Sequence, residues 1–127
     1  MKTVEIAVCD DEQVHIDRIV KYIEVYSEES EININITSYN SGMELLKDIE
    51  NDDLKYDIIF LDVEMPEING VDIARQIRKI TQDVIICFVT SFDKYAIQAY
   101  GVEALAYVVK PVAYAELKRV LSRAVVL

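Results

Sequence analysis

The sequence is poor in cysteine and in long hydrophobic runs, and each shortage argues against a class of protein. Its two cysteines, Cys9 and Cys87, lie in separate apolar stretches without the paired spacing of a zinc or redox motif. We therefore expect reduced thiols in the core of a cytoplasmic protein. The longest wholly apolar runs, Val84–Val89 and Ala104–Val109, are much shorter than a membrane span, so we expect no signal peptide and no membrane-spanning segment.

Positive charge is also scarce. The chain carries 13 Lys and Arg against 23 Asp and Glu, a formal net charge of -10 at pH 7. Because nucleic-acid binding relies on basic side chains that neutralise phosphates, any DNA binding would require a further domain. A length of 127 residues with 52% hydrophobic residues is typical of one folded unit, so we expect residues 1–127 to form a single domain.

Segments typical of strands alternate with amphipathic segments typical of helices. Strands are expected at Thr3–Cys9, in the alternating segment Ile32–Ile36, and at Ile58–Leu61, Val84–Val89 and Ala104–Val109. Helices are expected after Glu12, after Ser41, after Gly70, between Phe92 and Gly101, and along the apolar stripe from Tyr114 to Ala124. Ser41 and Glu44 have the spacing of a capping box, and Gly101 is placed to end the fourth helix.

This order predicts an α/β fold, a doubly wound five-stranded parallel sheet with five helices. The first, third and fourth strands are the most hydrophobic and belong at the centre, whereas the alternating Ile32–Ile36 segment belongs at an edge. The strand order 2-1-3-4-5 fits this distribution best. In that order the first and third strands diverge at the point where open α/β sheets bind ligands.

Polar side chains follow four of the five expected strands. Asp10 and Asp11 follow the first, Asp62 the third, Thr90 the fourth and Lys110 the fifth. Two unit charges about 4 Å apart interact by roughly 4 kcal/mol at an effective dielectric of 20, so three neighbouring carboxylates require a cation. Lys110 supplies one positive charge, and Mg²⁺ or Mn²⁺ would supply the rest.

Such a group of side chains suits phosphoryl transfer. An aspartate can act as a nucleophile that forms an acyl phosphate, while a metal and a lysine neutralise the transferring oxygens. Asp62 is the expected nucleophile because it lies between the acid pair and Thr90. Asp11 and Asp62 would bind the metal directly and Asp10 directly or through water, whereas Thr90 and Lys110 would bind phosphoryl oxygens.

The whole chain resembles the receiver domain of two-component response regulators, in a flavodoxin-like fold. The resemblance rests on the pair Asp10-Asp11, on the segment Leu61–Gly70 around Asp62, on Thr90, and on Lys110-Pro111. It implies that Asp62 accepts a phosphoryl group from a sensor histidine kinase. The expected role is that of a signalling phosphoacceptor with autocatalytic phosphotransfer and self-dephosphorylation, not that of a turnover enzyme.

The same resemblance implies roles for further residues. The backbone carbonyl of Glu64 would complete the metal site formed by the acid pair and the acceptor. Thr90 and Tyr107 would be the switch residues, Lys110 would bind phosphate, and the Lys110-Pro111 peptide bond would be cis. A plain core aromatic remains the alternative for Tyr107, and a solvent-facing loop acid the alternative for the side chain of Glu64.

Two stretches, Phe88–Tyr100 and Ala104–Pro111, resemble receivers that are attached to LytTR-type DNA-binding domains. The implied protein dimerises on phosphorylation through the surface of its fourth helix, fifth strand and fifth helix. It would bind DNA only through a C-terminal output domain that this chain does not contain. Such a domain is either lacking in the protein or was removed, and we favour removal. No membrane partner is expected.

Two other functions remain open at this stage. A Mg²⁺-dependent phosphohydrolase would also use Asp62 as its nucleophile, with Glu64 as a general acid, although the short loops leave little room for a substrate pocket. A receiver-like binding module that is never phosphorylated is the second. His15 lies near the acid pair, and we expect an ordinary surface or half-buried histidine there, not a phosphohistidine or a metal ligand.

Overall fold

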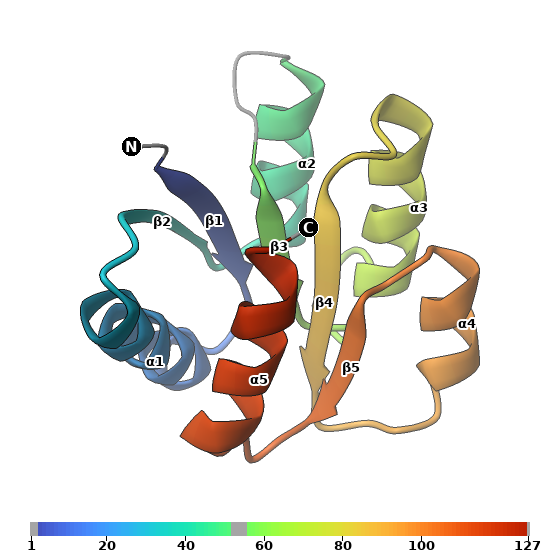
Figure 1. Cartoon of the computed structure of the whole chain (residues 1–127). Helices are drawn as coiled ribbons and strands as arrows, with labels where there is room; N and C mark the ends of the chain where they lie inside the picture. The colour runs from blue at the N-terminus through green and yellow to red at the C-terminus, as the bar shows by residue number, and fades with distance from the viewer. Residues whose placement is uncertain (1–2, 52–55, 127) are drawn as a thin grey trace.

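The computed structural model describes residues 3–51 and 56–126, which form one parallel sheet with helices on both faces (Figure 1). The strands are β1 (Val4–Cys9), β2 (Ile34–Tyr39), β3 (Ile58–Leu61), β4 (Ile85–Thr90) and β5 (Ala106–Val109). The helices are α1 (Gln13–Ser30), α2 (Gly42–Glu50), α3 (Gly70–Ile80), α4 (Ala96–Gly101) and α5 (Tyr114–Ala124). The strand order is β2-β1-β3-β4-β5, which confirms the predicted topology.

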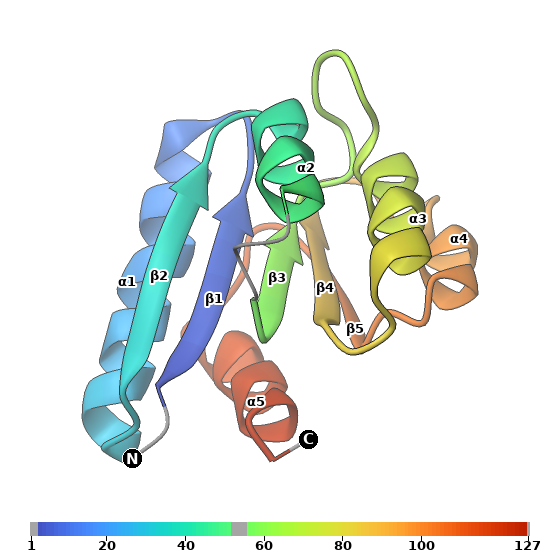
Figure 2. The same cartoon turned by 90° about the horizontal axis from the view of Figure 1, so that it is seen from above.

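Helices α1 and α5 cover one face of the sheet, and α2, α3 and α4 cover the other (Figures 1 and 2). Each face has its own apolar core: the α1 and α5 side packs Ile16, Ile23 and Leu117 against the sheet. The opposite side packs Leu45 and Ile73 in the same way. Burial on both faces explains why the central strands read as continuous apolar runs.

The exposure of the strands matches their places in the sheet. All four residues of β3 are buried, whereas β2 alternates between half-buried and exposed positions along most of its length. Strand β2 pairs with β1 at the edge of the sheet, as its alternating sequence predicted. Of the helices in residues 3–51 and 56–126, none combines the length and the apolar character needed to cross a bilayer.

Some local predictions were wrong. Strand β2 begins at Ile34, not Ile32, and β5 begins at Ala106, not Ala104. Gly101 is the last residue of α4 instead of its stop signal. The left-handed residue after this helix is Glu103, with a φ of 56°. Ser41 does precede α2, but its side chain makes no capping hydrogen bond within the described residues.

The start of α2 is instead held by packing. An added Cβ on Gly42 would lie 2.2 Å from Cδ1 of Ile73 in α3, so the two helices touch at this glycine. The N-terminus of α2, which Ser41 was expected to cap, is therefore positioned by its contact with α3.

Parallel pairing brings the carboxyl ends of β1 and β3 to the same edge of the sheet. Cys9 pairs with Leu61, and the amide of Asp62 donates to the carbonyl oxygen of Cys9 at 3.0 Å. The residues that follow these strands, Asp10 and Asp62, consequently leave the sheet side by side.

Candidate metal and phosphate site

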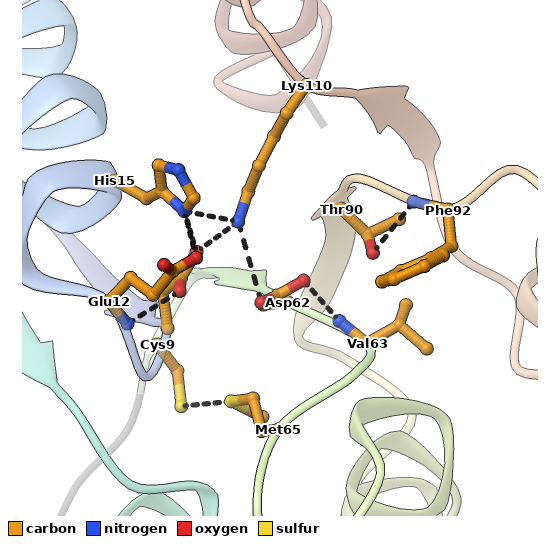
Figure 3. A network of polar contacts seen from close by, with 10 residues as sticks. Cys9, Glu12, His15, Asp62, Val63, Met65, Thr90, Phe92 and Lys110 are labelled. Carbon is orange, nitrogen blue, oxygen red and sulfur yellow. Dashed lines mark hydrogen bonds and ion pairs between the residues drawn. The ribbon is translucent and has the colours of Figure 1, made fainter.

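Asp62 occupies the first position after β3 and is buried. Its Oδ1 atom accepts a hydrogen bond of 2.8 Å from the amide of Val63, the next residue along the loop (Figure 3). This local bond orients the carboxylate and leaves Oδ2 directed toward Lys110. The sequence prediction that Asp62 stands where a buried strand gives way to a loop is confirmed.

Gly70 allows the loop after β3 to fold back onto Asp62. A Cβ at this position would lie 2.0 Å from the carbonyl oxygen of Asp62, closer than any side chain tolerates. The amide of Gly70 donates to the carbonyl of Val63, and Asn69 caps α3 by accepting from the amide of Val71 at 2.7 Å. The Asn-Gly pair is therefore a helix cap followed by a close backbone contact, and the left-handed residue of this loop is Glu67.

Three carboxylates meet at the site. One carboxylate oxygen from each of Asp10, Asp11 and Asp62 lies within 4.8 Å of the others. Asp10 is buried and its Oδ1 accepts from the amide of Glu12 at 2.9 Å, whereas Asp11 is exposed. An all-oxygen set that is partly open to solvent fits Mg²⁺, which prefers a few carboxylates and keeps several waters.

Lys110 reaches into the site from the end of β5. Its Nζ atom donates a 2.6 Å hydrogen bond to Oδ2 of Asp10 and lies 3.5 Å from Oδ2 of Asp62 (Figure 3). The side chain is only 10% exposed, so the ammonium is almost fully removed from water. The peptide bond that joins Lys110 to Pro111 is cis.

The negative charge at Asp62 is only partly compensated. Burial, and then the charge of Asp10, raise the pKa of the Asp62 carboxyl from 3.8 to about 6. The ammonium of Lys110, the amide of Val63 and the hydroxyl of Thr90 oppose this rise. Buried like charges favour protonation, so a divalent cation that replaced the proton would relieve the same cost.

Thr90 and Tyr107 lie beside the loop that follows β4. Thr90 is fully buried at the end of β4, and its Oγ1 atom accepts from the amide of Phe92 at 3.4 Å. The hydroxyl of Tyr107 donates to the carbonyl oxygen of the same Phe92. Tyr107 is half-buried and its ring lies beside that of Phe88. Thr90 of β4 and Tyr107 of β5 therefore both hydrogen-bond to the backbone of the loop at Phe92.

Two contacts at the site were missed from the sequence. Nδ1 of His15, in the first turn of α1, lies 2.8 Å from Nζ of Lys110. The carboxylate of Glu64 accepts a 3.0 Å hydrogen bond from the hydroxyl of Tyr95 and lies 3.5 Å from Nζ of Lys94. His15 is half-buried as expected, but its contact with Lys110 could not be predicted because the two residues are far apart in the sequence. The Glu64 side chain is tied to the loop before α4 instead of pointing freely into solvent.

The chain is similar to known response regulators. Residues 6–122 match the family model of the response regulator receiver domain. The sensory transduction protein LytT of Bacillus subtilis is 33% identical over 106 residues, which are 84% of this chain and 42% of LytT. The chain thus spans about two fifths of the length of that relative.

Solved structures agree with the sequence comparison. A receiver domain protein from Clostridium thermocellum has a TM-score of 0.82 at 27% identity, with 96% of this chain and 94% of that chain covered. The response regulator TrrA of Thermotoga maritima, solved in complex with Mg²⁺-BeF, has a TM-score of 0.72 at 30% identity, with 95% and 98% covered. The chain therefore belongs to the family of response regulator receiver domains.

Proposed function

We propose that Asp62 accepts a phosphoryl group from a sensor histidine kinase in a reaction that requires Mg²⁺ or Mn²⁺. The observation that carries the proposal is the meeting of the Asp10, Asp11 and Asp62 carboxylates beside the buried ammonium of Lys110. Two further features support it: the membership in the receiver family and the Mg²⁺-BeF complex of TrrA.

In the proposed reaction, a carboxylate oxygen of Asp62 forms a bond to phosphorus while the bond from phosphorus to the kinase's histidine nitrogen breaks. Asp10, Asp11, Asp62 and the backbone carbonyl of Glu64 would hold the metal. When bound, the metal neutralises negative charge on the transferring group. The ammonium of Lys110 would turn from Asp62 to a phosphoryl oxygen, and the hydroxyl of Thr90 would donate to another.

The site would thus act as a signalling phosphoacceptor that catalyses its own phosphorylation and dephosphorylation. A phosphohydrolase is less well supported, because the carboxylate of Glu64 is engaged by Tyr95 and Lys94 and is not free to protonate a leaving group. A module that is never phosphorylated is also less well supported, because the acids and the lysine are gathered at hydrogen-bond and ion-pair distances.

Phosphorylation would switch the surface formed by α4, β5 and α5. Once Thr90 turns to the phosphoryl group, the loop at Phe92 loses its hydrogen bond to that hydroxyl, and Tyr107 moves inward. A coupling of about 1 to 3 kcal/mol is enough to drive such a change. The exposed apolar residues Ile97 (85%) and Tyr100 (87%) on α4 support this surface as the contact between two copies of the chain.

In the whole protein, residues 1–127 would form the receiver domain and a further C-terminal domain of LytTR type would bind DNA. The similarity to LytT supports this arrangement, in which a cytoplasmic transcription regulator dimerises on phosphorylation. The net charge of -10 is consistent with a receiver that does not touch DNA itself.

Intact-mass measurement with acetyl phosphate and Mg²⁺ tests the acceptor. The wild type is expected to gain one phosphoryl group, and Asp62→Asn none. Equal labelling of the two proteins would contradict the assignment. Steady release of phosphate from small phosphomonoesters would favour the phosphohydrolase, and failure of Mg²⁺ to bind would favour the unphosphorylated module.

A further inference from the structure

We propose that His15 is a positioning residue for Lys110, holding its ammonium at the acceptor through a hydrogen bond to Nδ1. The inference rests on the proposed function, because it concerns how Lys110 is presented to the phosphoryl group. His15 is the only histidine of the chain and lies in the first turn of α1, far in sequence from Lys110.

Within the described part of the chain, the ammonium has three partners, one for each of its protons. Nζ lies 2.6 Å from Oδ2 of Asp10, 2.8 Å from Nδ1 of His15 and 3.5 Å from Oδ2 of Asp62. Figure 3 shows Lys110 descending from β5 with its tip between the imidazole and the acceptor. A lysine ammonium has three donors and no acceptor, and here it has two hydrogen bonds and one longer ion-pair contact.

The partners differ in what the proposed reaction does to them. Asp10 and Asp62 are both part of the proposed metal and phosphoryl site, and their oxygens would be claimed by the metal or bonded to phosphorus. His15 belongs to neither set and stays available to the ammonium throughout. One N–H of Lys110 would therefore remain fixed while the others turn to phosphoryl oxygens.

Holding one N–H of the ammonium in place matters for Lys110 because a lysine side chain is long and flexible. A lysine that is free to move loses rotamer entropy each time it engages a phosphate, and prior placement avoids that cost. The pair also lines a cavity of about 260 Å³, together with Arg18 and Ser91. The imidazole thus occupies a position beside the ammonium that water would otherwise fill, where it would compete for the same protons.

The contact also defines the tautomer of His15. Because an ammonium only donates, Nδ1 must accept, and the ring proton must lie on Nε2. Nδ1 lies 3.2 Å from Oε2 of Glu12 and 3.6 Å from Oδ2 of Asp10 as well. The Glu12 side chain is 61% exposed and turns aside at small cost, whereas Lys110 is held in place by its burial.

A measurement without metal or phosphate tests the contact directly. With ¹⁵N-labelled histidine, the single imidazole gives one pair of nitrogen resonances. We expect Nε2 to carry the proton, and we expect the resonance of Nδ1 to shift when Lys110 is replaced by Met. A proton on Nδ1 in the wild type, or an Nδ1 resonance that Lys110→Met leaves in place, would overturn the proposal.

Two substitutions test the role in phosphorylation. His15→Asn keeps an acceptor near the position of Nδ1, and His15→Leu removes it at similar size. At saturating Mg²⁺ and acetyl phosphate, His15→Leu should lower the labelling rate by roughly five- to tenfold, the effect of one lost hydrogen bond, and His15→Asn should retain most of the rate. The Mg²⁺ concentration for half-maximal labelling should be the same in all three proteins.

The outcomes separate this inference from the proposed function. Equal rates for His15→Leu and wild type, or an equal loss in the Leu and Asn variants, would contradict a positioning role. A change in Mg²⁺ dependence alone would also contradict it, since that would place His15 at the metal. If the wild type is not labelled at all while the imidazole responds to Lys110→Met, the proposed function fails and the contact between His15 and Lys110 stands.

Discussion

Nζ of Lys110 lies 3.5 Å from Oδ2 of Asp62, farther than the 2.6 Å that separates it from Oδ2 of Asp10. The lysine is thus bound most tightly to the acid of β1, and the acceptor carries charge that is only partly balanced. Burial and this incomplete compensation explain the raised pKa of Asp62, and they make the site destabilising at neutral pH when it holds no metal.

Replacing Asp62 by Asn should stabilise the metal-free protein in a pH-dependent way. The pKa of Asp62 is about 6 in the folded chain against an ordinary 3.8, so the folded state binds this proton more tightly. The stability from this group is complete below about pH 4 and is lost as the pH rises through about 6. At about pH 8, Asp62→Asn should raise the free energy of unfolding by about 1 to 3 kcal/mol.

Urea denaturation in EDTA over this pH range measures the effect. The gain should nearly vanish at about pH 3, below the ordinary pKa of 3.8, where both states are largely protonated. Asp72→Asn is the matched control, because Asp72 is an exposed acid on α3 paired with Arg75. A gain for Asp62→Asn that is the same at both ends of the pH range would contradict the account.

Adding Mg²⁺ should raise the thermal stability of the wild type. A ligand that binds only the folded state, at roughly a hundredfold excess over its Kd, stabilises by about 2.7 kcal/mol. Asp11→Asn should lose most of this response, because it removes one of the three carboxylates while leaving the Asp10–Lys110 hydrogen bond in place. Differential scanning calorimetry measures the shift, and an undiminished response in Asp11→Asn would count against the proposed metal site.

Gly70→Ala should destabilise the protein and impair the acceptor loop. The new Cβ would meet the carbonyl oxygen of Asp62 at 2.0 Å, and this backbone contact is not relieved by turning a side chain. We expect a loss of about 1 to 3 kcal/mol, the usual range for overpacking, together with slower labelling by acetyl phosphate.

Gly101→Ala is the paired control. No described atom lies within 4 Å of a Cβ at this position, so the substitution should be neutral or stabilise α4 by about 0.5 to 1 kcal/mol. Denaturant unfolding of the two variants side by side makes the comparison. Equal losses would show that contact with the acceptor loop is not what requires glycine at position 70.

Thr90→Ala should separate phosphorylation of Asp62 from the self-association that phosphorylation is proposed to cause. The hydroxyl of Thr90 touches the loop at Phe92, while the proposed metal and acceptor carboxylates come from other strands. Asp62 should therefore still be labelled by acetyl phosphate, more slowly because one hydrogen bond to a phosphoryl oxygen is lost, and the self-association of the phosphorylated chain measured by sedimentation should weaken. A variant that dimerises on phosphorylation as well as the wild type does would argue against Thr90 as the switch.

The fold was predictable because its main signals are repeated and local. The apolar run of β3 and the alternation before Tyr39 placed their strands at the centre and edge of the sheet. Parallel strands end at one edge, so the acids after β1 and β3 and the lysine after β5 were expected to meet, and they do.

What the sequence could not reveal depends on tertiary contacts. The spacing of Ser41 and Glu44 favours a capping box, but packing of Gly42 against Ile73 decides the start of α2. The contact of His15 with Lys110 joins α1 to β5, and no periodicity in either segment reports it. The available signal was the position of a histidine soon after the acid pair. That position alone did not show whether the imidazole contacts another side chain of the site or only solvent.

Locating the phosphoryl group within the chain tests the central claim most directly. Borohydride reduces an acyl phosphate of aspartate to homoserine, and peptide mass spectrometry then identifies the position that has changed. After treatment with acetyl phosphate and Mg²⁺, we predict that homoserine appears at Asp62. Homoserine at Asp10 or Asp11, or a phosphoryl group that resists reduction because it lies on another kind of side chain, would contradict the account.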